Sequence, residues 1–328
     1  MRNFTFKGLF LAAMFMVLGS LAIQAADDDG LITKQIIVKL EKAGTLPDRI
    51  GSTKRNKITN LKIIGEINGT DWRVIREMAG RDYYNDGTDG KLAILDLSEA
   101  KIVRGGDYYY YFNEEFYTHD NELGTHAFYG CRGLTSLTLP SGLTSIGSWA
   151  FTGCSSLTSL SLPSGLTSIG DQAFYGCSGL TSLSLPFGLT SIGNQAFFYC
   201  RGLTSLSLLS GLTSIGDGAF YGCSGLTSIY VYAEKMPKLG TNMFDDCDAK
   251  KCTVYVPKGT YDDYWLSEFG YFENIVEFEA TGINNVVTSN DTKELSRYSV
   301  NGQRLSAPTK GLNIVKYSDG SVKKVAVQ

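Results

Sequence analysis

The stretch that decides the fold spans residues 134–154 and reads LTSLTLPSGLTSIGSWAFTGC, and residues 157–177 repeat it as LTSLSLPSGLTSIGDQAFYGC. Near-identical units at a fixed period are typical of stacked repeat proteins, so the sequence predicts a solenoid. The period is 23 residues, and two columns of residues mark it. These columns are Phe128, Phe151, Phe174, Phe197 and Phe220, and Cys131, Cys154, Cys177, Cys200 and Cys223.

Each unit begins with a short strand. Leu137 and Leu139 are two residues apart, so in extended backbone both point to the core while Thr138 points away. Pro140 lacks an N–H group and ends the strand. One unit cannot bury its apolar edge alone, so we expect the strands of successive coils to pair in a parallel sheet, one strand per coil.

The pattern LxxLxLPxxLxxIGxxAFxxC resembles the BspA-like class of leucine-rich repeats, known from bacterial and protist surface proteins. The resemblance is close from residue 134 to about residue 231. It implies an α/β-type repeat solenoid, a right-handed stack with a parallel strand per coil. It also implies adhesion to host extracellular-matrix proteins, co-aggregation between bacteria or attachment to host cells.

Divergent units are expected at both ends, because terminal coils must be capped against water. Residues 61–67 and 92–97 predict earlier strands, and residues 72–78 predict a helical segment. Residues 243–247 are a degraded copy of the AFxxC element, and residues 253–257 predict a last strand.

The first residues have the order of a secretory signal. Arg2 and Lys7 are cationic, residues 9–23 are mostly apolar, and Ala25 precedes a run of aspartates. We expect cleavage after about Ala25, and hence a secreted chain or one on the outer cell surface; a membrane anchor is the alternative interpretation. No cysteine stands at the cleavage region to carry a lipid.

Composition narrows the range of partners. The formal charge of -3 and the pI near 5.5 give no support to a nucleic-acid or anionic-membrane partner, because proteins that bind either usually have a strongly basic surface. No stretch after the signal segment is apolar enough to span a membrane, so we expect no membrane span in the mature chain.

The C-terminal residues have a different pattern. A polar linker precedes residues 298–305, which carry Asn-Gly, and residues 312–327, each of which predicts a hairpin. This small β-rich module resembles the C-terminal tails of exported proteins of the same bacterial group. Some of those tails are sorting signals for the outer membrane; a plain structural module is the alternative.

The sequence thus predicts six segments. They are a signal peptide at 1–25, an N-terminal cap at 26–60, a solenoid at 61–256, a C-terminal cap at 257–280, a linker at 281–294 and a β tail at 295–328. Within the solenoid, regular repeats occupy about 126–232 and an insertion occupies about 103–124.

The cysteines do not predict a metal site. Seven cysteines leave at least one unpaired, and a row with one cysteine per coil cannot surround a zinc ion tetrahedrally. We expect the periodic cysteines to be buried free thiols that act as small apolar fillers. A disulfide between Cys247 and Cys252 stays open.

Catalytic and cofactor-binding groups are not indicated. His119 lies among Glu114, Glu115 and Glu122, which suggests either a weak cation site or, as we favour, a solvated acidic loop. His126 is expected at a tolerant outer position. Residues 85–90 are similar to a calcium loop but lack its full spacing and final Glu. The sequence therefore predicts no catalytic residue, no metal ligand and no cofactor.

The insertion is the most individual feature. Its aromatic residues suit recognition, since tyrosine offers a large contact area with little entropy to lose; packing on the solenoid flank is the alternative. The candidate ligand contacts are Tyr108, Tyr109, Tyr110, Tyr111, Phe112, Phe116 and Tyr117. A second aromatic column is Tyr129, Tyr175, Phe198 and Tyr221. The strand faces, with residues such as Thr135, Ser136 and Thr138, are monotonous.

These observations favour a non-enzymatic, exported or cell-surface binding protein that adheres to host or neighbouring-cell proteins. The alternatives are an envelope-associated glycan-binding protein and a purely structural scaffold. The ligand and the oligomeric state stay open.

Overall fold

The computed structural model describes residues 30–233 and 235–278, and in the C-terminal part the backbone of β18 (Glu294–Ser299), β19 (Arg304–Leu305), β20 (Gly311–Tyr317) and β21 (Val322–Val327). The predicted signal segment 1–25 and the predicted linker up to residue 293 lie outside the described residues. The described residues up to 278 form one compact unit, and strands β18 to β21 belong to a second. In the second unit the four strands form an antiparallel sheet in the order β19-β18-β20-β21.

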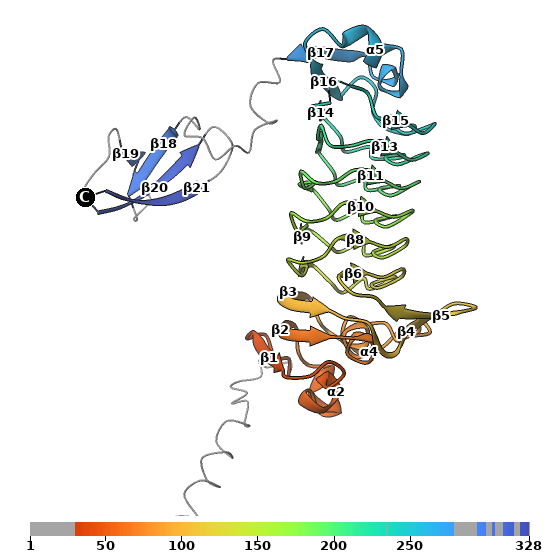
Figure 1. The fold of residues 1–328 in the computed structure, drawn as a ribbon, viewed down its shortest axis with the longest axis vertical. Helices are drawn as coiled ribbons and strands as arrows, with labels where there is room; N and C mark the ends of the chain where they lie inside the picture. The colour runs from red at the N-terminus through yellow and green to blue at the C-terminus, as the bar shows by residue number, and fades with distance from the viewer. Residues whose placement is uncertain are drawn as a thin grey trace, which may run out of the picture. The chain divides into compact units, whose positions relative to one another are not determined.

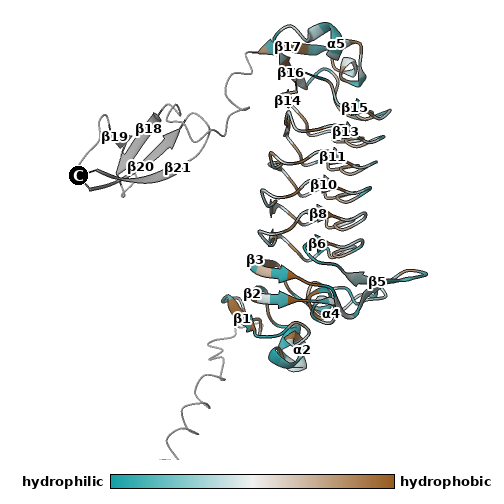
Figure 2. Ribbon diagram, viewed as in Figure 1, coloured by the Kyte–Doolittle hydropathy of each residue, from teal (hydrophilic) through white to brown (hydrophobic). Residues whose placement is uncertain are grey.

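The N-terminal part of the first unit starts a parallel sheet. Its order is β1-β2-β3-β7-β9, and its strands are β1 (Ile36–Leu40), β2 (Asn60–Ile67), β3 (Ile94–Ile102), β7 (Ser136–Thr138) and β9 (Ser159–Ser161). In Figure 2, β2 and β3 mix hydrophobic and hydrophilic residues, as expected of strands that bury one face. The strands predicted at 61–67 and 92–97 are confirmed.

Short helices occur at this end: α2 (Leu46–Arg49), α3 (Ser52–Arg55) and α4 (Gly69–Met78). The helix predicted at 72–78 is confirmed as part of α4. A capping box formed by Asn68 and Asp71 stabilises the N-terminus of this helix. The buried Asp71 carboxylate accepts the Asn68 N–H at 2.9 Å, and also the N–H groups of Gly44 at 2.6 Å and Leu46 at 2.8 Å. One carboxylate thus both caps α4 and fixes the loop that leads into α2.

The predicted parallel strands are confirmed, and the coils carry a further short strand that was not predicted, so that a second parallel sheet runs along the stack beside the first. Its strands are β6 (Glu122–Leu123), β8 (Ser145–Ile146), β10 (Ser168–Ile169), β11 (Ser191–Ile192), β13 (Ser214–Ile215) and β15 (Lys238–Leu239). The Ser-Ile strands of the regular coils pair in register, serine beside serine. Two residues are too few to show the alternation that signals a strand.

The C-terminal part carries β12 (Ser205–Leu208), β14 (Ser228–Val231), β16 (Thr253–Pro257) and β17 (Asn274–Phe278), in that order. The strand predicted at 253–257 is confirmed as β16, but it is not the last of this sheet, because β17 pairs with it in parallel. Between them lie α5 (Tyr261–Trp265) and the 3-10 helix η1 (Glu268–Tyr271). In the described part of the first unit, helices lie only toward the two ends, and the regular coils turn without them (Figure 1).

A spine of phenylalanine rings fills the coils. Successive rings from Phe128 to Phe244 stack with centroids 5.0–5.8 Å apart and planes within 11°. All of these rings are buried. The last ring confirms residues 243–247 as a degraded repeat element.

The cysteine column lies beside this spine. Cys177 Sγ donates to the carbonyl oxygen of Phe151 at 3.1 Å, and Cys154, Cys200 and Cys223 bond the preceding coil in the same way. All seven cysteines are buried, as predicted for the column, and all are free thiols, including Cys247 and Cys252. Burial raises the pKa of Cys200 to about 12.

A column of glycines sets the distance between coils. A Cβ atom on Gly193 would lie 2.5 Å from the backbone nitrogen of Asp171 in the preceding coil, and one on Gly170 would lie 2.6 Å from that of Ser148. Gly147 and Gly216 are equally close to their neighbours. Since real Cβ atoms do not approach a backbone so closely, the coils could not stack at this spacing with a side chain there.

We expect Gly193→Ala to lower the free energy of unfolding by about 1–3 kcal/mol, because a methyl group must be forced between two backbones. Urea unfolding would measure the change. The matched control is Gly87→Ala, since a Cβ at Gly87 meets nothing within 4 Å. Equal stabilities of the two variants would contradict the role of the glycine column.

The native thiols should resist modification by a disulfide reagent at pH 8, because they are buried and their thiolate forms are disfavoured. After unfolding in urea without reductant, all seven should react. A count of five would instead indicate a disulfide such as Cys247–Cys252.

Candidate binding surfaces

The insertion is a β-hairpin on the flank of the stack (Figure 1). Its strands are β4 (Gly105–Tyr111) and β5 (Glu115–Thr118), with Tyr110 opposite Phe116 and Tyr111 opposite Glu115. Asn113, at φ 60°, occupies the turn, where an asparagine tolerates the left-handed conformation. The hairpin packs against α4.

Two of the predicted contact residues face inward. Tyr109 and Tyr110 are both buried, so their prediction as ligand contacts was wrong. The pairing between β4 and β5 is irregular from Gly105 to Tyr110, and an irregularity of this kind lets consecutive residues turn to the same side. The simple alternation of a strand does not anticipate this.

Tyr109 anchors the hairpin to the first coil. Its hydroxyl donates to the carbonyl oxygen of Thr125 at 2.6 Å, and its ring meets Trp72 edge-on at 6.4 Å. Burial raises the pKa of Tyr109. The side chain is therefore a structural support for the hairpin.

The remaining tyrosines gather on the outer side of the hairpin. Tyr84 is 53% exposed, Tyr111 41% and Tyr117 43%. Their rings and those of Tyr83 and Tyr108 meet mostly edge to face, with centroids 4.4–6.3 Å apart. We call Arg73, Tyr83, Tyr84, Tyr108, Tyr111 and Tyr117 the tyrosine patch. Phe112, 63% exposed at the hairpin turn, extends the apolar surface of the hairpin.

Arg73 holds the patch together. Its guanidinium carbon lies 4.3 Å from the ring centre of Tyr83 and 4.1 Å from that of Tyr108, and its Nε donates to the Tyr108 carbonyl oxygen. Sequence reasoning missed Arg73, Tyr83 and Tyr84, which lie before the insertion. The Tyr-Tyr pair at 83–84 could have suggested a second aromatic surface. Its position beside the insertion arises only when the chain folds, so the sequence does not show it.

Carboxylates border the patch. The Tyr117 hydroxyl donates to Glu115, which raises the pKa of Tyr117. Glu114, Glu115, Glu122 and His119 line a neighbouring hollow of about 360 Å³. In the described ranges no three histidine, cysteine or acidic side chains are arranged to hold a metal ion. Asp120 instead accepts the N–H of Arg104 at 2.8 Å, which lowers the pKa of Asp120.

His126 was expected at a tolerant outer position, and that prediction was wrong: its side chain is nine-tenths buried, with 9% exposed. At φ 61° it occupies a left-handed column that continues through Trp149, Gln172 and Gln195. Here the imidazole enters a box of rings between the hairpin and the first coils. Phe116, another of the predicted contacts, is half-buried and forms one wall of that box.

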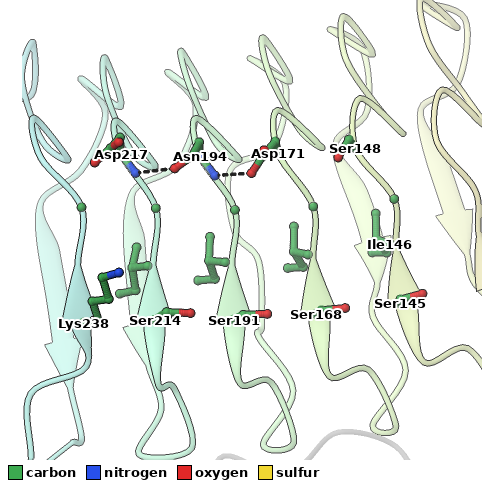
Figure 3. Close-up of a pocket in the computed structure, with 18 of the residues that line it drawn as sticks. Ser145, Ile146, Ser148, Ser168, Asp171, Ser191, Asn194, Ser214, Asp217 and Lys238 are labelled. Atoms are coloured by element: carbon green, nitrogen blue, oxygen red, sulfur yellow. Dashed lines mark hydrogen bonds between the residues drawn. The ribbon is translucent and has the colours of Figure 1, made fainter.

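The second sheet forms the floor of a long groove of about 710 Å³, shown in Figure 3. Half-buried serines stand along it, one per coil: Ser145, Ser168, Ser191 and Ser214. Within the described part of the chain their hydroxyls have no protein hydrogen-bond partner. The groove shares Thr125, Ser145 and Gly147 with the hollow beside the hairpin.

Other polar side chains along the coils are already bonded to their neighbours. The hydroxyls of Thr167 and Thr190 each donate to the equivalent carbonyl of the preceding coil at 3.0 Å. Thr135 and Thr158, which directly precede β7 and β9, do the same. These threonine hydroxyls stabilise the stack, which supports a structural role for the monotonous strand faces.

A ladder of acidic and amide side chains borders the groove (Figure 3). Asp171 Oδ1 accepts the Asn194 N–H at 2.7 Å, Asn194 Oδ1 accepts the Asp217 N–H at 2.9 Å, and Asp217 Oδ1 accepts the Thr241 N–H at 2.7 Å. Each side chain therefore holds the backbone of the next coil. Asp171 and Asp217 use only Oδ1 in this ladder, and both residues line the groove.

The second aromatic column is partly continuous. Tyr175, Phe198 and Tyr221 stack with ring centroids 4.9 and 4.6 Å apart. Tyr129 is not part of this stack, because the coil between it and Tyr175 has Thr152 at the same position. The rings are half-buried. Because they stack on one another, their faces are largely occupied.

The family comparison fits this geometry. Residues 121–251 match the family model described as BspA type leucine rich repeat region, in 6 copies. This part of the chain is a BspA-type leucine-rich-repeat region. No curated protein matches the chain. Among the described residues, no helix has the length and apolar character needed to cross a membrane.

Solved structures of bacterial leucine-rich-repeat proteins are similar to the chain. A Treponema pallidum leucine-rich-repeat protein is 27% identical over 45% of this chain and 78% of its own, with a TM-score of 0.35. A leucine-rich cell surface protein of Faecalibacterium prausnitzii is 20% identical over 68% of this chain and 51% of its own (TM-score 0.32). The pneumococcal vaccine antigen PcpA is 14% identical over 68% and 69% (TM-score 0.41).

The BspA-type match begins after the hairpin. Residues 105–118 and α4, which carry most of the tyrosine patch, lie outside the matched residues 121–251. The match therefore covers the repeats, and most of the patch lies outside it.

Tyr109→Phe should lower the free energy of unfolding by about 0.5–1.5 kcal/mol, because it removes the hydrogen bond from the buried Tyr109 side chain to the carbonyl oxygen of Thr125. Thermal unfolding would measure the loss. Tyr117→Phe is the matched control, since its hydroxyl bonds an exposed carboxylate, and it should change stability by less than about 0.5 kcal/mol. An equal loss in both variants would contradict the anchoring role of Tyr109.

Proposed function

We propose that the chain is an exported protein of the cell surface that adheres to a protein of the host or of a neighbouring cell. The observation that carries the proposal is the tyrosine patch, an exposed aromatic surface arranged around one arginine. The signal-like residues 1–25 support export, and the BspA-type repeats support a binding scaffold. The predicted sorting role of the tail belongs to the same proposal.

The composition of the patch favours a protein partner. Tyrosine and arginine dominate the residues that contribute most to protein–protein affinity. Sugars stack on free ring faces, but in the patch Arg73 and the edges of neighbouring rings occupy much of that area. The patch is also preorganised, because Tyr109 and Tyr110 fix the hairpin from below.

The arrangement does not suggest an enzyme. The nearest acidic groups, at Glu114, Glu115 and Glu122, lie in an open hollow, and His126 is enclosed by aromatic rings. We therefore infer a binding role without chemistry at this surface.

The test is binding of the chain without residues 1–25 to an array of matrix proteins and glycans. The double variant Tyr111→Ala, Tyr117→Ala should bind its protein target at least about tenfold more weakly, because two exposed anchors are lost. Phe187→Ala is the matched control: Phe187 is as exposed as Tyr111, at 41%, but lies in a distant coil. Equal binding by both variants would refute the patch.

Glycan binding along the serine groove is the second candidate function, favoured by the serine hydroxyls that lack protein partners. The same array separates the two. Glycan binding that survives loss of the tyrosines but disappears in Ser168→Ala, Ser191→Ala would support the groove and not the patch.

A further inference from the structure

The imidazole of His126 lies in an aromatic box that two parts of the chain build together. The hairpin contributes Tyr110, stacked at 4.5 Å and 13°, and Phe116, edge-on at 5.0 Å. The first coils contribute Trp149, stacked at 5.7 Å, and Tyr129, edge-on at 5.4 Å. One side chain thus connects the hairpin to the repeats.

The box fits only a neutral imidazole. His126 Nδ1 is buried and has no hydrogen-bond partner, so a second ring N–H would be a buried donor without an acceptor. An unmet buried donor is unfavourable, and burial of the charge itself adds to this cost.

The charges around the box oppose protonation as well. Helix α4 contributes the fully buried Arg76, which donates to the carbonyl oxygens of His126 at 2.8 Å and Ala127 at 3.0 Å. Strand β4 contributes the hydroxyl of Tyr110, the first coil contributes that of Tyr129, and Phe116 and Trp149 contribute no titratable group. Among the described residues, neither His126 nor Arg76 forms an ion pair with a carboxylate.

One interaction favours the cation, since Tyr110 and Trp149 could stack on an imidazolium. Such contacts stabilise a cation by less than the combined cost of burial, the unmet donor and the repulsion from Arg76. The balance agrees in direction with the lowered pKa of His126, about 4, caused first by burial and then by Arg76.

We propose that His126 is an acid-sensitive latch, whose protonation loosens the hairpin tip, residues 110–117, and so disassembles the outer part of the tyrosine patch. This inference rests on the proposed function only for its consequence, because the latch itself is a property of the unliganded chain. The regulation is of the same surface that we propose as the binding site.

The repeats should remain folded when the latch opens. The His126 N–H donates to the carbonyl oxygen of Ser148 at 3.0 Å and the Phe128 N–H to that of Ala150 at 2.7 Å, so the backbone of this coil is held independently of the imidazole. The tip depends more on the box, since Tyr110, Phe112 and Phe116 all pack around the imidazole.

The sign of the pH effect follows from the two states. In the released state the imidazole has its ordinary pKa near 6.5, whereas in the box its pKa is about 4. Below pH 6.5 the released state binds a proton that the closed state does not bind, so acid favours release until about pH 4. The opening equilibrium should rise by up to about tenfold per pH unit across this window.

Hydrogen–deuterium exchange of the unliganded chain, corrected for the intrinsic pH dependence of exchange, tests the latch. Protection of the amides of residues 110–117 should fall about tenfold per pH unit from pH 6.5 toward pH 4, while the Phe151 and Phe174 amides stay protected. The matched control is His126→Gln, because glutamine occupies the same left-handed position at Gln172 and Gln195 and does not titrate.

The proposal is overturned if the wild type and His126→Gln lose protection at the tip in parallel, or if the repeats open together with the tip. Selective loss in the wild type supports it. A failed latch would leave the binding of a protein target at pH 7 unchanged, and a failed binding assay would leave the exchange result unchanged, so the two proposals are judged separately.

Discussion

Direct backbone contact between successive coils is the constraint on which the rest of the structure depends. The coils approach so closely at Gly147, Gly170 and Gly193 that no Cβ atom fits. This approach brings the Ser-Ile strands into register, stacks the phenylalanine rings and lets each cysteine thiol reach the preceding carbonyl. Each polar ladder along the coils is a consequence of the same spacing.

The repeats could be predicted from the sequence because every regular coil packs the same residue types at the same positions. The 23-residue period alone predicted the solenoid, the buried cysteines and the aromatic column. The second sheet was missed because each of its strands has two residues, and the left-handed backbone at Trp149 and Gln172 leaves no residue signature. The right hand of the stack and the boundaries of caps, linker and tail stay predictions.

The candidate site was only partly readable, for physical reasons. The insertion was recognisable as the segment that differs from the repeats, but the irregular pairing of β4 turns both Tyr109 and Tyr110 inward, where they cannot contact a ligand. Arg73 and Tyr84 join the patch through tertiary contact across more than twenty intervening residues. Nothing in the sequence indicates that His126 differs from the same position in other coils, because the hairpin buries it and no other coil in the described residues carries such a hairpin.

The glycine column has a consequence for evolution. Each regular coil contacts little beyond its two neighbours, and Ser168 follows Ser145 in the same register as Ser191 follows Ser168. Duplication of a 69-nucleotide segment, which encodes one 23-residue coil, would therefore lengthen the stack without disturbing either end. Each added coil would extend the molecule by about 4.8 Å. The number of repeats could thus change during evolution, and with it the length of the stack, while the hairpin surface stays the same.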